Sequence, residues 1–382
     1  MFKTVDRKNT QSIKWDQVKR DDCLPFTIAD SEYESPKPII DALNLRVNHG
    51  VFGYTYFDDT YYQIIINYVK RHYGYSINRS EIITTMDVVG SLYYAIKMLD
   101  AKSEGVIIQT PVYNMFYGLI EKTNKKVIEN KLIEEEGYYK MDFDHLEGLF
   151  AQGYKIMILC NPHNPVGRVY RDEELKRLVL LAKKYDVYLL SDEIHADIIL
   201  NDNKFISLMN YYPLYENMMV FVSPSKSFNI AGLHISLVIS KNDYLMETYR
   251  KITEDNFFKN PSLLSITALK AAYKDCDDWL IAQNKHLTNN YRIIQDYFKK
   301  HHPQAILSKV EGTYLLWINL QYLNVSCEEV SKAFMEHHIL MAKGTVYSPD
   351  SEGYFRLNFA CSTEQLLEGL HRLSQTIQLL EK

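Results

Sequence analysis

Short, uninterrupted apolar runs recur along the first two-thirds of the chain, at residues 81–85, 105–110, 154–160, 186–192, 220–223 and 237–240. Runs without polar alternation are typical of strands buried on both faces, so we expect parallel strands. Between two of these runs, Leu175, Leu178, Val179 and Ala182 recur at helical spacing behind an acidic first turn. The pattern predicts crossover helices and βαβ architecture.

The pattern changes near Trp279. Residues 287–302 form a polar and aromatic stretch that predicts a helix, and two strand-like segments follow at 312–320 and 353–360. Pro36 and Pro38 interrupt the pattern near the N-terminus. We therefore expect a large domain over 47–282 and a smaller α+β domain made of 1–46 together with 283–382.

Composition narrows the class of protein. The chain has 382 residues, of which 46% are hydrophobic and 24% charged, as in a soluble globular protein of two or more domains. Its formal net charge of -5 and its short basic pairs, such as Lys183 and Lys184, argue against nucleic-acid binding. No apolar run is long enough for a membrane span, and the first residues lack the apolar core of a signal peptide. Five scattered cysteines without a Cys-x-x-Cys pair indicate a reducing compartment, and we expect a cytoplasmic protein.

Polar segments follow three successive apolar runs: "NPHNPVG" at 161–167, "DEIHAD" at 192–197 and "SPSK" at 223–226. Open parallel sheets bind their ligands at the carboxyl ends of the strands, so we expect these segments to meet in one site. Taken singly, each also fits a turn, a helix cap or local backbone bonding. The acids and histidine of 192–197 suggest a metal site too, but neighbours at a strand end point to opposite faces and no tight ligand motif supports it, so we predict no metal.

Lys226 lies at the end of the third segment, among serines. A lysine beside a buried strand either extends its charge to water or is held as a nucleophile. Only its partners elsewhere in the chain distinguish these alternatives.

In combination, "NPHNPVG", "SDEIH" and "SPSKSFNIAGL" resemble the fold-type I pyridoxal-phosphate (PLP) enzymes, the aspartate aminotransferase superfamily. The segments "LPFTIAD", "HGVFGYT", "TPVY", "EGTYLLW" and "FRLNFAC" are similar to the branch of MalY/PatB-type cystathionine β-lyases and cysteine desulfhydrases. The resemblance runs from about residue 24 to the C-terminus. It implies an α/β, fold-type I PLP-dependent transferase fold, with a mostly parallel sheet sandwiched by helices and a smaller α+β domain, and pyridoxal 5'-phosphate as cofactor.

The resemblance also implies roles for single residues. Lys226 would bond covalently to the cofactor and move the proton of the substrate α-carbon. Asp192 would pair with the pyridinium nitrogen, and Tyr113 would stack on the ring. Asn164 would donate to the phenolic oxygen, beside His195, which stands where aminotransferases commonly carry a tyrosine.

The cofactor phosphate needs N–H and O–H donors. The sequence places Val88 and Val89 where a turn enters a helix, so their backbone N–H groups and the helix dipole suit an anion. Ser223 and Ser225 would complete this phosphate site. Many relatives carry an arginine eight residues after the lysine, where this chain has His234.

Three further assignments follow from the resemblance. Tyr54 would reach the phosphate of a neighbouring subunit, which implies a homodimer. Arg356, together with Asn164, would bind the substrate, its planar fork holding the α-carboxylate. Residues 29–33, "ADSEY", replace the usual Ala-Asp-Met-Asp-Phe and are expected to border the substrate side chain.

We predict a PLP-dependent carbon–sulfur β-lyase that cleaves L-cystathionine or a related cysteine S-conjugate to a thiol (homocysteine), pyruvate and ammonia. The alternative is a PLP-dependent aminotransferase, because both reactions begin with loss of the α-proton. A third reading is a PLP-binding protein that acts by binding a transcriptional regulator. The expected partners are a small amino-acid substrate and a second copy of the chain.

Overall fold

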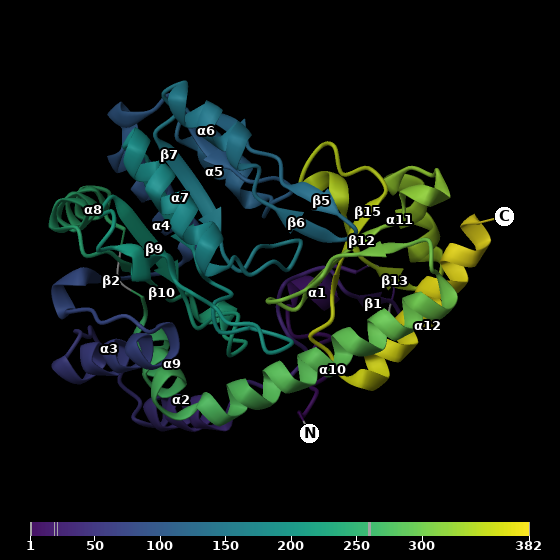
Figure 1. Ribbon diagram of the computed structural model, residues 1–382. Helices are drawn as coiled ribbons and strands as arrows, with labels where there is room; N and C mark the ends of the chain where they lie inside the picture. Colours follow the sequence, from purple (N-terminus) through teal and green to yellow (C-terminus); the bar gives the residue numbers. More distant parts are fainter. Residues whose placement is uncertain (1, 19, 21, 259–260, 382) are drawn as a thin grey trace.

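The computed structural model describes residues 2–18, 20, 22–258 and 261–381. Its centre is a seven-stranded sheet, drawn in Figure 1. In spatial order the strands are β2 (Ile82–Thr85), β10 (Ser236–Ile239), β9 (Met218–Val222), β8 (Tyr188–Asp192), β7 (Ile156–Cys160), β3 (Gly105–Ile108) and β4 (Lys126–Glu129). Each apolar run identified in the sequence overlaps one of these strands.

One strand of this sheet runs against the others. Strands β9, β8, β7, β3 and β4 pair in parallel, whereas β10 is antiparallel to both β9 and β2. The mostly parallel sheet is confirmed, but the expectation of parallel pairing is wrong for β10. The link from β9 to β10 contains no crossover helix, only the short 3₁₀ turn Ala231–Leu233, so the chain returns beside β9 in the opposite direction. An antiparallel strand that is buried on both faces has the same apolar sequence pattern as a parallel strand.

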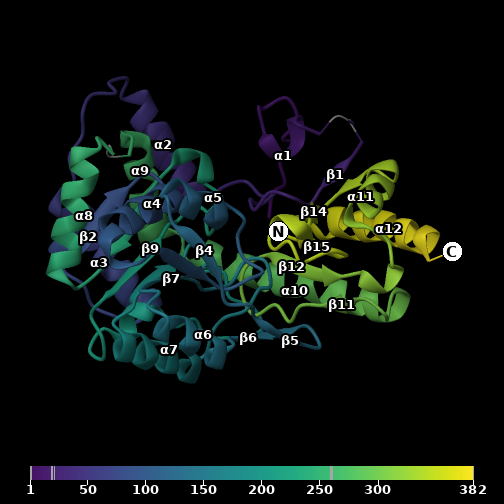
Figure 2. The same ribbon diagram turned by 90° about the horizontal axis from the view of Figure 1, so that it is seen from above.

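Helices cover both faces of the sheet. Alternate strand residues belong to two hydrophobic clusters, so that Met157 and Leu159 face one layer while Ile156 and Ile158 face the other. The first layer contains α3 (Asp59–Tyr73), α6 (Phe143–Ala151), α7 (Asp172–Tyr185) and α9 (Leu263–Asp275), and the second contains α4 (Val88–Met98), α5 (Met115–Lys122) and α8 (Asp243–Asp255). Figure 2 shows α6 and α7 on one side and α4 and α5 on the other. This sandwich exposes the carboxyl ends of the parallel strands at one edge.

A second, antiparallel sheet lies beside the first. Its order is β11 (Ile306–Leu307), β12 (Leu315–Asn319), β15 (Tyr354–Asn358) and β14 (Ala342–Lys343). Three helices pack with it in a separate hydrophobic cluster: α10 (Asp277–His301), α11 (Cys327–Glu336) and α12 (Thr363–Leu380). Strand β12 and strand β15 are the two strand-like segments expected in this region. Trp317 and Arg356 are opposite one another in their register.

The predicted domain boundaries, at 46/47 and 282/283, stay a prediction. Helix α10 runs continuously through the second of them. Helix α2 (Lys37–Asn48) packs against α9, and its Ile39 belongs to the core of the large sheet. The segment before α2 instead packs into the hydrophobic cluster of the second sheet, and its β1 (Leu24–Pro25) pairs with β13 (Ile339–Leu340) in a separate two-stranded sheet.

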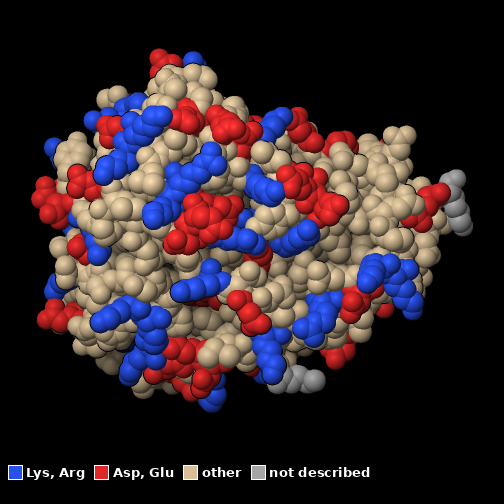
Figure 3. All heavy atoms as spheres, in the orientation of Figure 1, with Lys and Arg blue, Asp and Glu red and all other residues tan. Residues whose placement is uncertain are grey.

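The remaining regular elements are α1 (Ile13–Asp16) and the hairpin of β5 (Ile133–Glu135) and β6 (Tyr138–Lys140). Among the described residues, no helix has both the length and the apolar character needed to cross a membrane. In the same part of the chain, no three His, Cys, Asp or Glu side chains are grouped as a metal site. On the face shown in Figure 3, basic and acidic side chains are intermingled.

Candidate active site

A cavity of about 520 Å³ opens where β7, β8 and β9 end. The segment 27–29 and residues of the second sheet close its other side. Among its lining residues are all the predicted site residues except Tyr54, namely Val88, Val89, Tyr113, Asn164, Asp192, His195, Ser223, Ser225, Lys226 and Arg356. The expectation that three strand ends share one site is therefore supported by the fold.

Asp192 and Lys226 occupy the base of this cavity. Asp192 is the last residue of β8, and its Oδ1 accepts a hydrogen bond from Ile194 N at 3.1 Å. Burial raises the pKa of Asp192 to about 7. Burial also lowers the pKa of Lys226 to about 8, while the nearby Asp30 carboxylate opposes this shift. An amine with a pKa near neutrality suits proton transfer at physiological pH better than an ordinary lysine does.

The amine of Lys226 has a defined partner. Its Nζ donates to the backbone carbonyl of Ala29 at 2.6 Å, and the hydroxyl of Tyr314 donates to the same oxygen at 3.0 Å. Lys226 is therefore half-buried, and its amine bonds within the protein. This geometry favours the nucleophile reading over the surface reading that the sequence left open.

The start of α4 provides an anion site at another part of the cavity. Asp87 caps this helix by accepting from Gly90 N at 2.6 Å, as expected for an aspartate at an N-cap. Val88 and Val89 form the first turn, where backbone N–H groups have no partner within the helix. The dipole of the helix adds to the attraction for a phosphate.

Two serine hydroxyls complement this helix end. Ser223 Oγ lies 2.7 Å from Ser225 Oγ, and Ser223 Oγ also donates to Ile235 O at 2.6 Å. Both serines line the cavity, as does His234. An arrangement of helix N–H groups and hydroxyls suits a phosphate bound chiefly by hydrogen bonds.

Arg356 provides the cationic group on the opposite side. It extends from β15, its Nη1 donates to Asn164 Oδ1 at 3.0 Å, and its Nη2 donates to Thr27 O. Its guanidinium carbon lies 4.8 Å from the ring centre of Tyr347. Within the described part of the chain, the buried Nε of Arg356 has no hydrogen-bond partner. Since buried donors are normally satisfied, this free donor fits a carboxylate ligand.

Tyr113 and His195 remain uncharged in this setting. Burial raises the pKa of Tyr113 to about 12 and lowers the pKa of His195 to about 3. The ring of His195 lies edge-on to Tyr314, with 5.8 Å between centres. Its Nδ1 is buried and lacks a hydrogen-bond partner among the described residues. A neutral phenol and a neutral imidazole can both contact a cofactor without adding charge.

These features together fit pyridoxal phosphate. Asp192 would pair with the protonated ring nitrogen, and Asn164 and His195 would contact the polar edge of the ring. Tyr113 would stack on the face of the ring. The phosphate would lie against Val88 and Val89 with the two serines. The unsatisfied Nδ1 of His195 and the buried carboxylate of Asp192 are polar groups that such a ligand would complete.

The structure adds residues that motif reasoning missed. Thr27, Ile28, Met86, Met115 and Tyr347 also line the cavity. The neighbouring "ADSEY" segment signalled that this part of the chain borders the substrate, and its Ala29 does line the cavity. Nothing in the local sequence around Tyr347 indicated a site, because its place depends on the second sheet.

Tyr54 is the one predicted site residue outside the cavity. It lies between α2 and α3, and its side chain is fully exposed, at 111% of the reference value. At this position Tyr54 does not line the cofactor cavity of its own chain. Its assignment to a partner subunit stays a prediction.

The fold and this site define a PLP enzyme built on an aminotransferase scaffold. The sequence model of the class I and II aminotransferases matches residues 21–373, and the chain belongs to that family. The chain is 30% identical to cystathionine beta-lyase PatB of Bacillus subtilis, over 98% of this chain and 99% of PatB. It is 31% identical to the protein MalY of Escherichia coli, over 98% of each.

A solved structure agrees with these relatives. Cystalysin from Treponema denticola, which contains pyridoxal 5'-phosphate, superposes with a TM-score of 0.95 at 32% identity, over 99% of this chain and 98% of that one. The family, the fold class and the cofactor inferred from the sequence are thereby confirmed.

Proposed function

We propose that this protein is a PLP-dependent carbon–sulfur β-lyase acting on L-cystathionine or a related cysteine S-conjugate. The observation that carries the proposal is the meeting of Lys226, Asp192 and Arg356 in one cavity. The names of PatB and of the other cystathionine β-lyase relatives favour this reaction within the family. The products would be a thiol, pyruvate and ammonia.

The chain's own residues supply binding and proton transfer. When bound, the cofactor withdraws electrons from the substrate α-carbon, which makes its proton acidic. Arg356 holds the substrate carboxylate and so presents the α-hydrogen toward the amine of Lys226. Lys226 takes that proton, which its lowered pKa permits. Loss of the β-thiolate follows, and water releases ammonia and pyruvate.

Transamination is the second candidate, since the matched family is named for it. It needs the same first proton transfer but returns the proton to the cofactor side and retains the sulfur. The two reactions therefore differ in their products and not in the residues that start them.

The decisive experiment is a product balance with L-cystathionine. We expect homocysteine, pyruvate and ammonia in equal amounts, with Lys226→Ala as the inactive control. Accumulation of pyridoxamine phosphate and a new amino acid in the presence of a 2-oxo acid, with no pyruvate from cysteine conjugates, would contradict the lyase and support the aminotransferase.

We further propose a homodimer as the active form. The segment between α2 and α3 exposes large apolar side chains: Val51 and Phe52 are 60% and 59% exposed, and Tyr56 is 82% exposed. A partner subunit that covers this segment would also bring Tyr54 to the phosphate of the other active site. Sedimentation of the PLP-loaded protein distinguishes dimer from monomer.

A further inference from the structure

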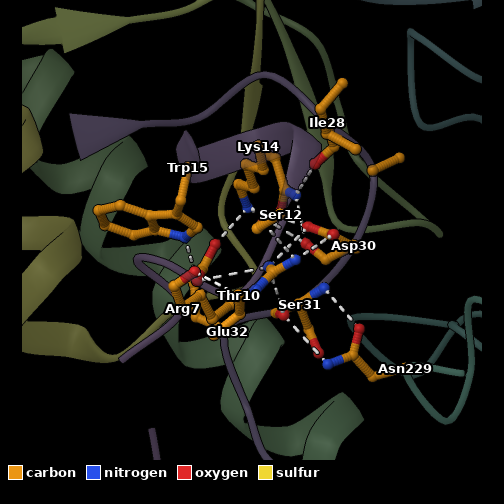
Figure 4. A network of polar contacts seen from close by, with 12 residues as sticks. Arg7, Thr10, Ser12, Lys14, Trp15, Ile28, Asp30, Ser31, Glu32 and Asn229 are labelled. Atoms are coloured by element: carbon orange, nitrogen blue, oxygen red, sulfur yellow. Dashed lines mark hydrogen bonds and ion pairs between the residues drawn. The ribbon is translucent and has the colours of Figure 1, made fainter. Parts of the chain in front are cut away.

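The N-terminal segment places two cations, Arg7 and Lys14, on the acids Asp30 and Glu32 (Figure 4). Lys14 Nζ lies 2.5 Å from Glu32 Oε1, and Arg7 Nη2 lies 2.6 Å from Asp30 Oδ2. Trp15 Nε1 donates to the second carboxylate oxygen of Glu32 at 2.8 Å. We call Arg7, Lys14 and Trp15 the N-terminal clamp.

The central ion pair of this clamp is buried. The side chains of Lys14 and Glu32 are 2% and 3% exposed. Desolvation makes such a pair a poor source of stability, and removing one partner leaves the other charge buried. These contacts best fit a role in which the buried ion pair holds one segment of the chain in a single position.

Asp30 and Glu32, the acids that the clamp contacts, belong to a segment whose backbone faces the active site. Ala29 O accepts from Lys226 Nζ at 2.6 Å, and Thr27 O accepts from Arg356 Nη2. Asn358 Nδ2 donates to Ile28 O at 2.6 Å and to Asp30 O at 2.7 Å. The carbonyls of Thr27 and Ala29 thus contact the arginine and the lysine of the proposed mechanism, while those of Ile28 and Asp30 are held by Asn358.

The clamp contacts this same backbone directly. Lys14 Nζ lies 3.3 Å from Asp30 O and 3.5 Å from Asp30 Oδ1. On the far side, Asn229 Oδ1 accepts from Ser31 N at 3.2 Å, and Asn229 Nδ2 donates to Ser31 O at 3.1 Å. Asn229 follows Lys226 closely in the chain, so residues 29–31 are held between the clamp and the lysine loop.

We propose that the N-terminal clamp is a positioning device for the active site, which fixes residues 27–30 so that their carbonyls place the amine of Lys226 and the guanidinium of Arg356. This inference rests on the proposed roles of Lys226 and Arg356. The clamp residues act through the backbone of this segment and are positioning residues.

The first test is Lys14→Met in the PLP-loaded, full-length protein. Because small displacements of reacting groups are costly, we expect kcat/KM for the cysteine conjugate to fall roughly 10- to 100-fold, with kcat reduced as well as KM raised. Lys14→Arg should recover most of the rate. The matched control is Lys3→Met, since Lys3 pairs with Glu34 at 3.1 Å in the same region but is 71% exposed; it should change kcat/KM less than about twofold.

A second readout does not depend on turnover. In the cofactor-free protein, the acylation rate of the neutral Lys226 amine, taken from the high-pH plateau of its pH profile and resolved by mass spectrometry, reports on the contact between Nζ and Ala29 O, because the plateau removes the effect of nearby Lys14 on the pKa of Lys226. We expect Lys14→Met to raise this rate severalfold and Lys3→Met to leave it unchanged. If the wild type cleaves no carbon–sulfur bond, the proposed function fails, but the acylation measurement still tests whether the clamp positions Lys226.

A further variant separates positioning from folding. Lys14→Met/Glu32→Gln removes both buried charges and keeps an oxygen acceptor for Trp15, so its melting temperature should return toward that of the wild type. The altered acylation rate and the kinetic defect should persist. Wild-type kinetics and acylation in a folded Lys14→Met protein, or full recovery of both in the double variant, would overturn the proposal; if Lys14→Met does not fold, the double variant decides.

Discussion

Replacing Arg356 tests how the active site binds the substrate carboxylate. The side chain is buried, its Nη1 and Nη2 are held by Asn164 and Thr27, and its Nε has no partner among the described residues. A carboxylate that accepts from Nε and from a remaining Nη hydrogen would form two charge-assisted hydrogen bonds. The arginine is already oriented for this contact before the substrate binds.

The size of the effect follows from these bonds. Each charge-assisted hydrogen bond contributes about 1.5–3 kcal/mol, so losing two corresponds to roughly 10²- to 10⁴-fold in kcat/KM for Arg356→Ala. Arg356→Lys keeps the charge but not the fork, and we expect a smaller loss of about 10- to 100-fold. KM should rise in both variants. In Arg356→Ala, kcat should also fall, because the same contact orients the α-hydrogen toward Lys226.

The assay is initial-rate pyruvate release from cystathionine, with the PLP content of each variant measured from its visible absorbance. A matched ligand control is S-methylcysteamine, which resembles S-methylcysteine but lacks the carboxylate. Its binding, followed through the cofactor spectrum, should be nearly the same in wild type and Arg356→Ala. A loss in kcat/KM below about threefold, or an equal loss of affinity for S-methylcysteamine, would refute the assignment.

Four further predictions concern the cofactor and the assembly. Borohydride should fix the cofactor on Lys226 of the native protein and on no residue of Lys226→Ala; a label on another lysine would contradict the assignment. Asp192→Ala should keep the wild-type circular dichroism spectrum but lose most turnover, because the electron-withdrawing ring loses its charged partner; wild-type kcat would speak against this role. Tyr54→Phe should weaken cofactor retention on dialysis by about 1.5–3 kcal/mol, and a fully active monomer would exclude the intersubunit contact. Since burial lowers the pKa of Lys226 from 10.5 to about 8, the unfolded state binds more protons between these values. The free energy of unfolding of the cofactor-free wild type, measured relative to Lys226→Met, should therefore rise by roughly 3 kcal/mol as the pH increases from 8 to 10.5, and a falling difference would be inconsistent with a buried amine.

Much of the fold could be read from local patterns. The apolar runs at 154–160 and 186–192 become β7 and β8 because their side chains are buried on both faces, a condition visible in each run by itself. The crossover helix expected from the spacing of Leu175, Leu178, Val179 and Ala182 is α7, which buries these four residues. Strand direction was not visible, and the reversal of β10 depends on how the chain returns after Val222.

The active-site features likewise divide into those that the sequence indicated and those that only the tertiary structure placed. Asp192 ends a strand, and Asn164 and Lys226 follow strand ends, all in recognisable motifs, so the sequence alone indicated which side chains would meet at the sheet edge. Only the tertiary structure decided that Ala29 O accepts from Lys226 and that Tyr347 packs on Arg356. These contacts join segments far apart in the chain, and their formation depends on how residues 27–29 and the second sheet pack over the strand ends of the first sheet. A local pattern records the burial of each element, whereas the position of a distant partner follows from the free energy of packing the whole chain.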